Sequence, residues 1–210
     1  MSDLSSNEAA RFLASALRAQ RSIVHVGDGE TARQLGASGF AVHALCCGEP
    51  FLARNVTYLE DDLAAAPACD AWVFSASLHA HDLDHALDHA LAKAPIVVID
   101  DFASEMYDAP TARWFETACK LLQIDATAPA SPHTSEAIKH ALAARDASTR
   151  ELSRVPYLYR LLSRTPKGAD IACQLYSTER RGITLGAIRP TGLRIVATRG
   201  RDTYSRPSPA

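Results

Sequence analysis

Short apolar segments alternate along this chain with segments that carry apolar residues at helical spacing. The clearest strand candidate is IVVIDD at 96–101, which is nearly all β-branched, as expected for a strand buried on both faces. The other strand candidates are 22–26, 40–45, 56–59, 71–75, 149–155 and 192–198. Strands that alternate with helices predict a parallel sheet with helices on both faces. We therefore predict an α/β fold with a doubly wound, mostly parallel seven-stranded sheet.

The predicted helices lie between these strands. The helix predicted at 6–20 follows Ser5, which forms a capping box with Glu8. Its buried stripe consists of Ala9, Phe12, Leu13, Ala16 and Leu17, at the spacing of one helix face. Asp82 is the expected N-cap of a helix at 82–93. Further helices are predicted at 31–37, 110–122, 134–145 and 165–181.

Length and charge limit the classes of protein to which this chain can belong. The 210 residues contain no linker or repeat, so we expect one domain over 1–200 and a flexible polar tail at 201–210. With 22 basic and 24 acidic residues, the chain lacks the basic excess of a nucleic-acid binder. Its apolar runs are too short to cross a membrane, and its start does not look like a signal peptide. The five cysteines form no C-x-x-C pair, which favours a cytoplasmic protein without disulfides.

Ligands of open α/β sheets bind beyond the carboxyl ends of the strands. Gly27-Asp28-Gly29 follows the first strand and opens a helix, where glycines permit a close approach of the backbone. Read as G-x-G-x-x-A up to Ala32, the segment also fits a dinucleotide fingerprint. That fingerprint has an acidic residue at the end of the second strand, where this chain has Cys46. A nicotinamide-dependent oxidoreductase is therefore one alternative.

Several segments, taken in order, resemble the motifs of one protein family. IVHVGDGETARQLGASGFAVHAL is similar to its first motif and second strand, and NVTYLEDDL to its segment that reaches the adenine. CDAWVFSASLHAHDLDHAL and IVVIDDFASE are similar to its fourth and fifth strands with the loops that follow, and RVPYLYRLL and IRPTGLRIVATR to its final strands. The family is the class I S-adenosylmethionine-dependent methyltransferases of the small-molecule type. The resemblance covers nearly the whole chain and implies a Rossmann-like methyltransferase fold.

The resemblance also implies a set of cofactor-binding residues. They are Gly27, Asp28, Gly29, Cys46, Asp61, Asp62, Leu63 and Ser77, with Asp62 at the place of the acid that holds the adenine amine. Three residues depart from the family pattern: His25 replaces an acid in the first strand, Thr31 a third small residue, and Cys46 the acid that holds the ribose. Because a thiol cannot replace a carboxylate on a diol, we predict that S-adenosylmethionine binds weakly.

Methyl transfer requires mainly that the acceptor is aligned with the methyl group, and a base only where the acceptor must lose a proton. His79 and His81, after the fourth strand, are the best-placed bases, and Asp101, after the fifth strand, is the next. A solvated loop histidine is an equally good interpretation of each imidazole. The segment PYLYR at 156–160 either lines an acceptor pocket or packs a helix against the sheet.

His81, His85 and His89 recur every four residues, a spacing that can place zinc ligands on one face of a helix. The buried stripe of the same segment already consists of Leu83, Leu87 and Leu91. We therefore expect His85 and His89 to face water, and we predict no metal site.

Two functional hypotheses follow from the resemblance, beside the nicotinamide-dependent alternative given above. The first is a cytoplasmic enzyme that transfers a methyl group from S-adenosylmethionine to a small organic acceptor, without a metal, a nucleic acid or a membrane. The second is a non-methylating relative that keeps the fold and uses the cleft for binding, regulation or another reaction such as a cyclisation. The departures at His25, Thr31 and Cys46 favour the second hypothesis.

Overall fold

The structure, a computed structural model, describes residues 4–45, 53–60, 62–101, 103–106, 120, 133–152 and 193–200, without the side chains of 4–8. At its centre is a seven-stranded sheet with the order β3-β2-β1-β4-β5-β7-β6. Its strands are β1 (Ser22–Gly27), β2 (Ala41–Leu45), β3 (Val56–Tyr58), β4 (Ala71–Ser75), β5 (Ile96–Asp101), β6 (Ala147–Glu151) and β7 (Leu193–Arg199). The first five strands pair with one another in parallel, and β7 is antiparallel to both of its neighbours, β5 and β6. This confirms the predicted sheet.

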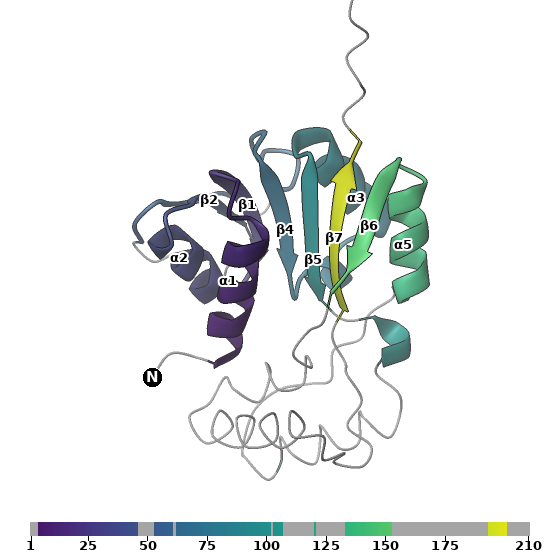
Figure 1. The fold of residues 1–210 in the computed structure, drawn as a ribbon, viewed down its shortest axis with the longest axis horizontal. Coiled ribbons are helices and arrows are strands. Elements are labelled where there is room, and N and C mark those ends of the chain that lie inside the picture. Colours follow the sequence, from purple (N-terminus) through teal and green to yellow (C-terminus); the bar gives the residue numbers. More distant parts are fainter. Residues whose placement is uncertain are drawn as a thin grey trace, which may run out of the picture.

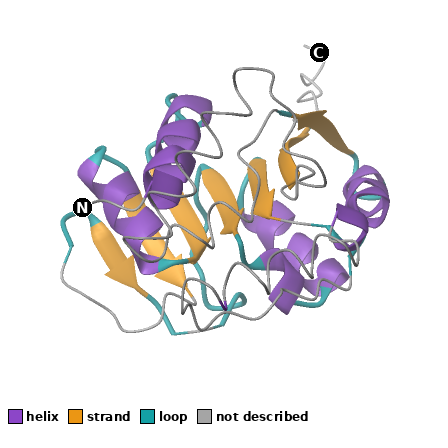
Figure 2. Ribbon diagram, turned by 90° about the horizontal axis from the view of Figure 1, so that it is seen from below, coloured by secondary structure: helices purple, strands orange, loops and turns teal. Residues whose placement is uncertain are grey.

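Helices cover both faces of the sheet, as predicted (Figure 1). The helices α1 (Leu4–Ala16) and α2 (Gly29–Ala37) pack on one face, and α3 (Leu83–Lys93) and α5 (Ser135–Ala143) pack on the other. The short 3-10 helices η1 (Leu78–Ala80) and η2 (Ser104–Met106) follow β4 and β5. Figure 2 looks at the molecule from below and shows the strands side by side between the helices.

Alternating side chains of β5 enter two separate apolar layers. Val97 and Ile99 belong to the layer under α3 and α5, whereas Val98 belongs to the layer under α1 and α2. The prediction of a strand buried on both faces is confirmed for 96–101. The same alternation directs Asp100 toward the α1 face and Asp101 toward the α3 face, which places two carboxylates on opposite sides of one strand end.

Two helix starts differ from the prediction. The helix α1 begins at Leu4, so Ser5 lies within the helix and the predicted capping box is wrong. It ends at Ala16 rather than at residue 20, and a looser turn follows in which the Gln20 amide donates to the Leu17 carbonyl. The helix α2 begins at Gly29 rather than at residue 31, because Asp28 acts as its N-cap.

The strand β6 spans 147–151 rather than the predicted 149–155. Asp146 has a φ of 55°, so the chain turns sharply after α5 and enters the strand at once. Pairing continues to Leu152, whose amide donates to the Arg194 carbonyl at 2.9 Å. Residues 153–155 of the predicted strand lie outside the described residues.

Some predictions fall on parts of the chain that the structure does not describe. They are the helices at 110–122, apart from Lys120, and at 165–181, and the tail at 201–210. The division into one domain and a tail therefore stays a prediction. Within the described ranges, no helix combines the length and the apolarity that crossing a bilayer requires.

Candidate functional site at the carboxyl edge of the sheet

The ends of β1, β4 and β5 meet the start of β7 at one edge of the sheet. Gly27, Ser75, Asp100 and Arg194 are partners in register across these four strands. Neighbouring strands lie about 4.8 Å apart, so the four residues form a continuous row. Ser75, Asp100 and Arg194 are all buried. This edge is where open α/β sheets bind ligands, and it lies at the lower end of the sheet in Figure 1.

Gly27 ends β1 in a conformation that favours glycine. Its φ is +149°, and a Cβ atom built on it would lie 2.3 Å from the carbonyl oxygen of Ser75. No side chain fits between β1 and β4 at this point. The close packing of β1 against β4 is therefore sufficient to explain why the motif begins with a glycine, Gly27.

Asp28 is the N-cap of α2. Its carboxylate accepts hydrogen bonds from the Thr31 amide at 2.7 Å and from the Thr31 hydroxyl at 2.9 Å. Thr31 is fully buried, and this bond satisfies its hydroxyl, which explains how a threonine is accommodated where the family has a small residue. An acid at this position also interacts favourably with the helix dipole.

The loop after β4 contains a strained residue. Ala76 has a φ of 53°, which is uncommon outside glycine, and its amide donates to the Asp100 carbonyl at 2.8 Å. The Ser77 hydroxyl donates to the Val26 carbonyl at 2.7 Å in a buried position. These bonds to β5 and β1 hold the strained loop in place, and such residues often occur at functional sites.

His79 in η1 lies against Asp101 at the end of β5. The His79 Nδ1 atom is 3.0 Å from Asp101 Oδ1, and the His79 amide donates to Asp101 Oδ2 at 3.2 Å. The Asp101 side chain is 1% exposed and the His79 side chain 21% exposed. The carboxylate favours the tautomer with the proton on Nδ1, which makes Nε2 the basic atom of the ring. A carboxylate that orients a histidine in this way is a common design for a general base.

His81, the third candidate for catalysis, is engaged in other contacts. Its ring centroid lies 6.4 Å from that of Phe74, and its carbonyl is 2.9 Å from His133 Nε2. The sequence prediction missed His133, because it lies far along the chain from His81 and belongs to no motif. The structure thus brings together His79 and Asp101, and places His81 in the packing beside them.

Contacts from η2 connect this edge to the start of α5. Glu105 Oε1 accepts hydrogen bonds from the Ser135 amide at 2.8 Å and from the Ser135 hydroxyl, and the Ser104 amide donates to the His133 carbonyl at 2.8 Å. Burial raises the pKa of the Glu105 carboxyl, but the hydrogen bonds from Ser135 and from its own amide, together with the charge of Lys139, outweigh this effect, so its pKa lies below the usual value. No sequence signal pointed to this connection.

A buried ion pair lies on the α1 side of the same edge. Arg194 Nε and Nη2 are each 3.3 Å from an oxygen of Asp100. The guanidinium carbon of Arg194 also lies 3.8 Å from the ring centroid of Phe12 in α1, a cation–π contact. Arg194 therefore joins β7, β5 and α1 at the edge of the site. The sequence prediction missed this pair as well, because the two residues are distant in sequence.

The segment after β3 holds two of the implied cofactor-binding residues. Asp62 is exposed, and its Oδ1 atom accepts from the Ala64 amide at 2.8 Å. Leu63 is buried in the core, and its carbonyl accepts from Lys93 Nζ at 3.3 Å. Lys93 also donates to the carbonyl of Ala66 at 2.6 Å, so the end of α3 fixes the position of this segment.

Other predictions cannot be placed on the described structure. Cys46, Asp61 and the segment 156–160 lie outside the described residues. Their roles stay predictions, as do the cofactor contacts of Gly27, Asp28, Gly29, Asp62, Leu63 and Ser77.

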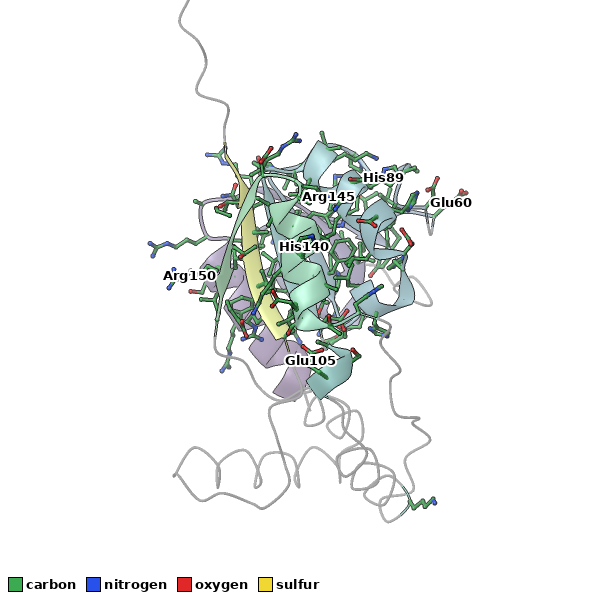
Figure 3. The ribbon with its side chains drawn as sticks, turned by 90° about the vertical axis from the view of Figure 1, so that its right-hand side faces the viewer. Glu60, His89, Glu105, His140, Arg145 and Arg150 are labelled. Carbon is green, nitrogen blue, oxygen red and sulfur yellow. The ribbon has the colours of Figure 1, made fainter. Side chains whose placement is uncertain are left out.

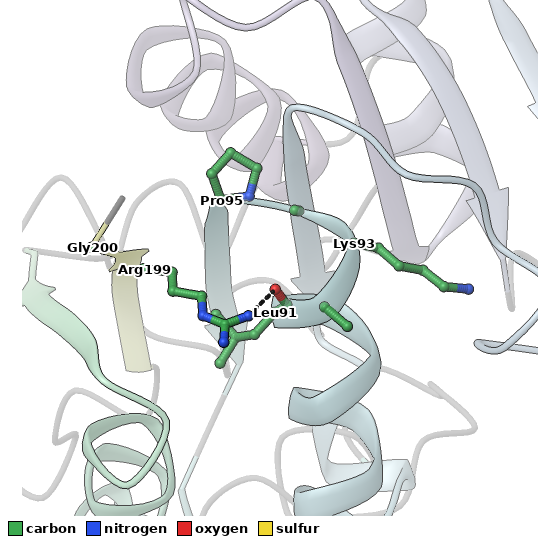
Figure 4. Close-up of a pocket in the computed structure, with 7 residues that line it drawn as sticks. Leu91, Lys93, Pro95, Arg199 and Gly200 are labelled. Atoms are coloured by element: carbon green, nitrogen blue, oxygen red, sulfur yellow. Dashed lines mark hydrogen bonds between the residues drawn. The ribbon is translucent and has the colours of Figure 1, made fainter. Parts of the chain in front are cut away.

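A pocket of about 420 Å³ lies at the opposite edge of the sheet, where β5 begins and β7 ends (Figure 4). It is lined by Leu91, Ala92, Lys93, Ala94, Pro95, Arg199 and Gly200. Arg199 Nη1 donates to the Leu91 carbonyl at 3.4 Å. These lining residues include no carboxylate or imidazole that could act as an acid or a base.

No protein-family model matches the sequence, and no curated protein sequence matches it significantly. Solved structures do match it. Magnesium protoporphyrin IX methyltransferase (ChlM) from Synechocystis PCC 6803 with bound SAH has a TM-score of 0.55 at 13% identity, over 94% of this chain and 83% of that chain. This chain has the methyltransferase fold.

Two further structures match this chain at similar TM-scores. The plantazolicin methyltransferase BpumL, in complex with SAH and a desmethylPZN analog, has a TM-score of 0.56 at 10% identity, over 94% of this chain and 85% of that chain. The YcgJ protein from Bacillus subtilis has a TM-score of 0.56 at 11% identity, over 93% of this chain and 99% of that chain. The Rossmann-like methyltransferase fold that the sequence predicts is confirmed. At these identities the likeness concerns the fold, and function must be argued from the site.

Proposed function

We propose that this protein transfers a methyl group from S-adenosylmethionine to a small organic acceptor, and that His79 is the base. The observation that carries the proposal is the contact of His79 Nδ1 with Asp101 Oδ1, at 3.0 Å. It lies at the carboxyl ends of two neighbouring strands of a methyltransferase fold, where ligands of such sheets bind. The nearly balanced charge of the chain also supports a small acceptor over a nucleic acid.

The described residues fit an adenosyl cofactor on the β1 and β3 side of this edge. Asp62 is exposed, and among the described residues the Ala64 amide donates to its Oδ1 atom, so its second oxygen can accept a bond from an exocyclic amine. Asp28 and Asp62 supply negative charge, which suits a ligand with a net positive charge. When bound, the cofactor supplies a methyl group that its sulfonium has already activated.

The chain's own residues would then act on the acceptor. His79 Nε2 takes the proton from an acceptor hydroxyl or amine as that heteroatom forms its bond to the methyl carbon. Asp101 holds the opposite nitrogen and stabilises the positive charge that the ring gains. Because the Asp101 side chain is 1% exposed, water screens this interaction little. A positioned base of this kind contributes about 10²–10⁴-fold in rate.

An acceptor screen tests the proposal. The purified protein is incubated with S-adenosylmethionine and pooled phenols, amines and carboxylic acids, and release of S-adenosylhomocysteine is followed by mass spectrometry. We expect release with at least one hydroxyl or amine class, at a rate that rises with acceptor concentration. Absence of release from all classes, together with absence of cofactor binding, would contradict the proposal and favour the non-methylating hypothesis.

A further inference from the structure

Helix α3 brings two imidazole rings together on its outer face. The Nε2 atoms of His85 and His89 are 3.1 Å apart, and the rings meet edge to face with centroids 4.4 Å apart. His85 is exposed and His89 is half-buried. The opposite face of the helix is the buried one, with Ala86, Leu87, Ala90 and Leu91. His81 does not share this face, since it lies before the helix begins.

Two ring nitrogens at this distance share either a proton or a cation between them. A neutral imidazole has one protonated nitrogen and one with a free lone pair. With metal–nitrogen bonds of about 2.0–2.1 Å, a separation of 3.1 Å gives an angle at the metal of about 100°. This value lies between the octahedral and tetrahedral angles, so the separation of the two nitrogens is compatible with both rings binding one ion.

The charged residues around the pair are fixed by other contacts. Arg145 Nη2 lies 2.9 Å from Asp84 Oδ1, and Arg145 Nε lies 2.7 Å from Asp88 Oδ1. The bond from Arg145 lowers the pKa of Asp88, which keeps this carboxylate charged and paired with the arginine. Asp82 accepts from the His85 amide at 2.9 Å as the N-cap of α3. Figure 3 shows His89 and Arg145 toward the same end of the molecule, away from Glu105.

We propose that His85 and His89 form a bidentate site for a divalent transition-metal ion such as Ni²⁺, Cu²⁺ or Zn²⁺. Imidazole suits these ions. Within the described residues no group of three or more metal-ligating side chains is found, so water completes the coordination and the ion exchanges freely. The proposal departs from the sequence prediction of no metal site, for a loosely bound ion only. The proposal is independent of methyl transfer, because the pair lies outside the carboxyl edge.

Calorimetric titration with NiCl₂ tests the site. His85→Ala and His89→Ala each remove one ligand, and alanine keeps the helix. His140→Ala is the matched control, since His140 is a single exposed histidine on α5 (Figure 3). Loss of an outer-shell partner already weakens metal binding about 10–100-fold, so each ligand variant should bind at least about tenfold more weakly. Circular dichroism of each variant verifies that it is folded.

We expect His140→Ala to bind Ni²⁺ as the wild type does. Equal binding by wild type and His85→Ala, or no binding by the wild type at millimolar Ni²⁺, would overturn the proposal. The contact between His85 and His89 would then be explained by a shared proton. Electron paramagnetic resonance with one equivalent of Cu²⁺ provides a second readout. The wild type should show two coupled imidazole nitrogens and His89→Ala one, and the same number in both proteins would also overturn the proposal.

Discussion

The two halves of the carboxyl edge differ in what their polar groups do. On the β1 side, the groups of the glycine motif are used within the fold: Asp28 caps α2, and Gly27 makes room for the Ser75 carbonyl. On the β4–β5 side, His79 and Asp101 form a pair in which the imidazole is partly exposed. The motif that is most visible in the sequence therefore shapes the turn, whereas the residues suited to acid–base chemistry lie in η1 and at the end of β5.

The largest effect should come from filling the space at Gly27. In Gly27→Ala the new methyl group would meet the Ser75 carbonyl at 2.3 Å, with a φ of +149°. Backbone strain and overpacking each cost about 1–3 kcal/mol, so we expect the free energy of unfolding to fall by about 4 kcal/mol. Urea denaturation measures it.

Gly39→Ala is the control for backbone strain alone. Gly39 has a φ of +100° and nothing within 4 Å of a built Cβ atom, so we expect a loss of about 1–2 kcal/mol. Equal losses in the two variants would show that the close approach of β1 and β4 is not what requires Gly27.

The second-largest effect should come from removing the proposed base, His79, on the β4–β5 side. His79→Gln should lower turnover with the acceptor found in the screen by about 100-fold, because the base is lost, while S-adenosylhomocysteine binds as before. His81→Gln should lower turnover much less, since the His81 ring packs near Phe74. Steady-state kinetics and calorimetry measure the two quantities. If His81→Gln has the larger effect on turnover, the assignment of the base is wrong.

The sequence predicted the fold well and the site only in part. The β-branched strand at 96–101 and the N-cap at Asp82 have local signals, and both were confirmed. The pairing of His79 with Asp101 could have been predicted, because His79 follows β4 and Asp101 ends the neighbouring strand β5. His133, Arg194 and Glu105 carry no local signal, since their partners are distant in sequence and only the folded sheet brings them together.

A substitution at Cys46 would test the predicted contact with the ribose on the β1 side. By the family resemblance, Cys46→Asp restores a carboxylate for the ribose diol, and bonds to a charged group contribute about 1.5–3 kcal/mol each before desolvation. We expect S-adenosylhomocysteine to bind about tenfold more tightly, which corresponds to a net gain of about 1.4 kcal/mol. Cys47→Asp should give little, because successive side chains near a strand end point to opposite faces. A gain in Cys47→Asp alone would mean that the register is shifted by one residue.

The smallest effect separates a structural role of Ser77 from a role in binding. Ser77→Ala leaves the buried Val26 carbonyl without the hydrogen bond that it accepts at 2.7 Å, so we expect a loss of about 1 kcal/mol in stability. Thermal unfolding measures this loss. A purely structural role predicts that the affinity for S-adenosylhomocysteine stays unchanged in the same variant, whereas the family resemblance predicts that it falls. A large loss of affinity without a loss of stability would assign Ser77 to the cofactor instead.

The most direct test of the proposed function is calorimetric titration of the wild-type protein with S-adenosylhomocysteine, beside a parallel titration with NAD. By the family resemblance, Cys46 replaces the acid that holds the ribose, so the protein should bind the first ligand weakly, at one site, and should not bind NAD. Saturable heat with S-adenosylhomocysteine and none with NAD is the predicted result. No heat with millimolar S-adenosylhomocysteine, or tight binding of NAD, would contradict the account.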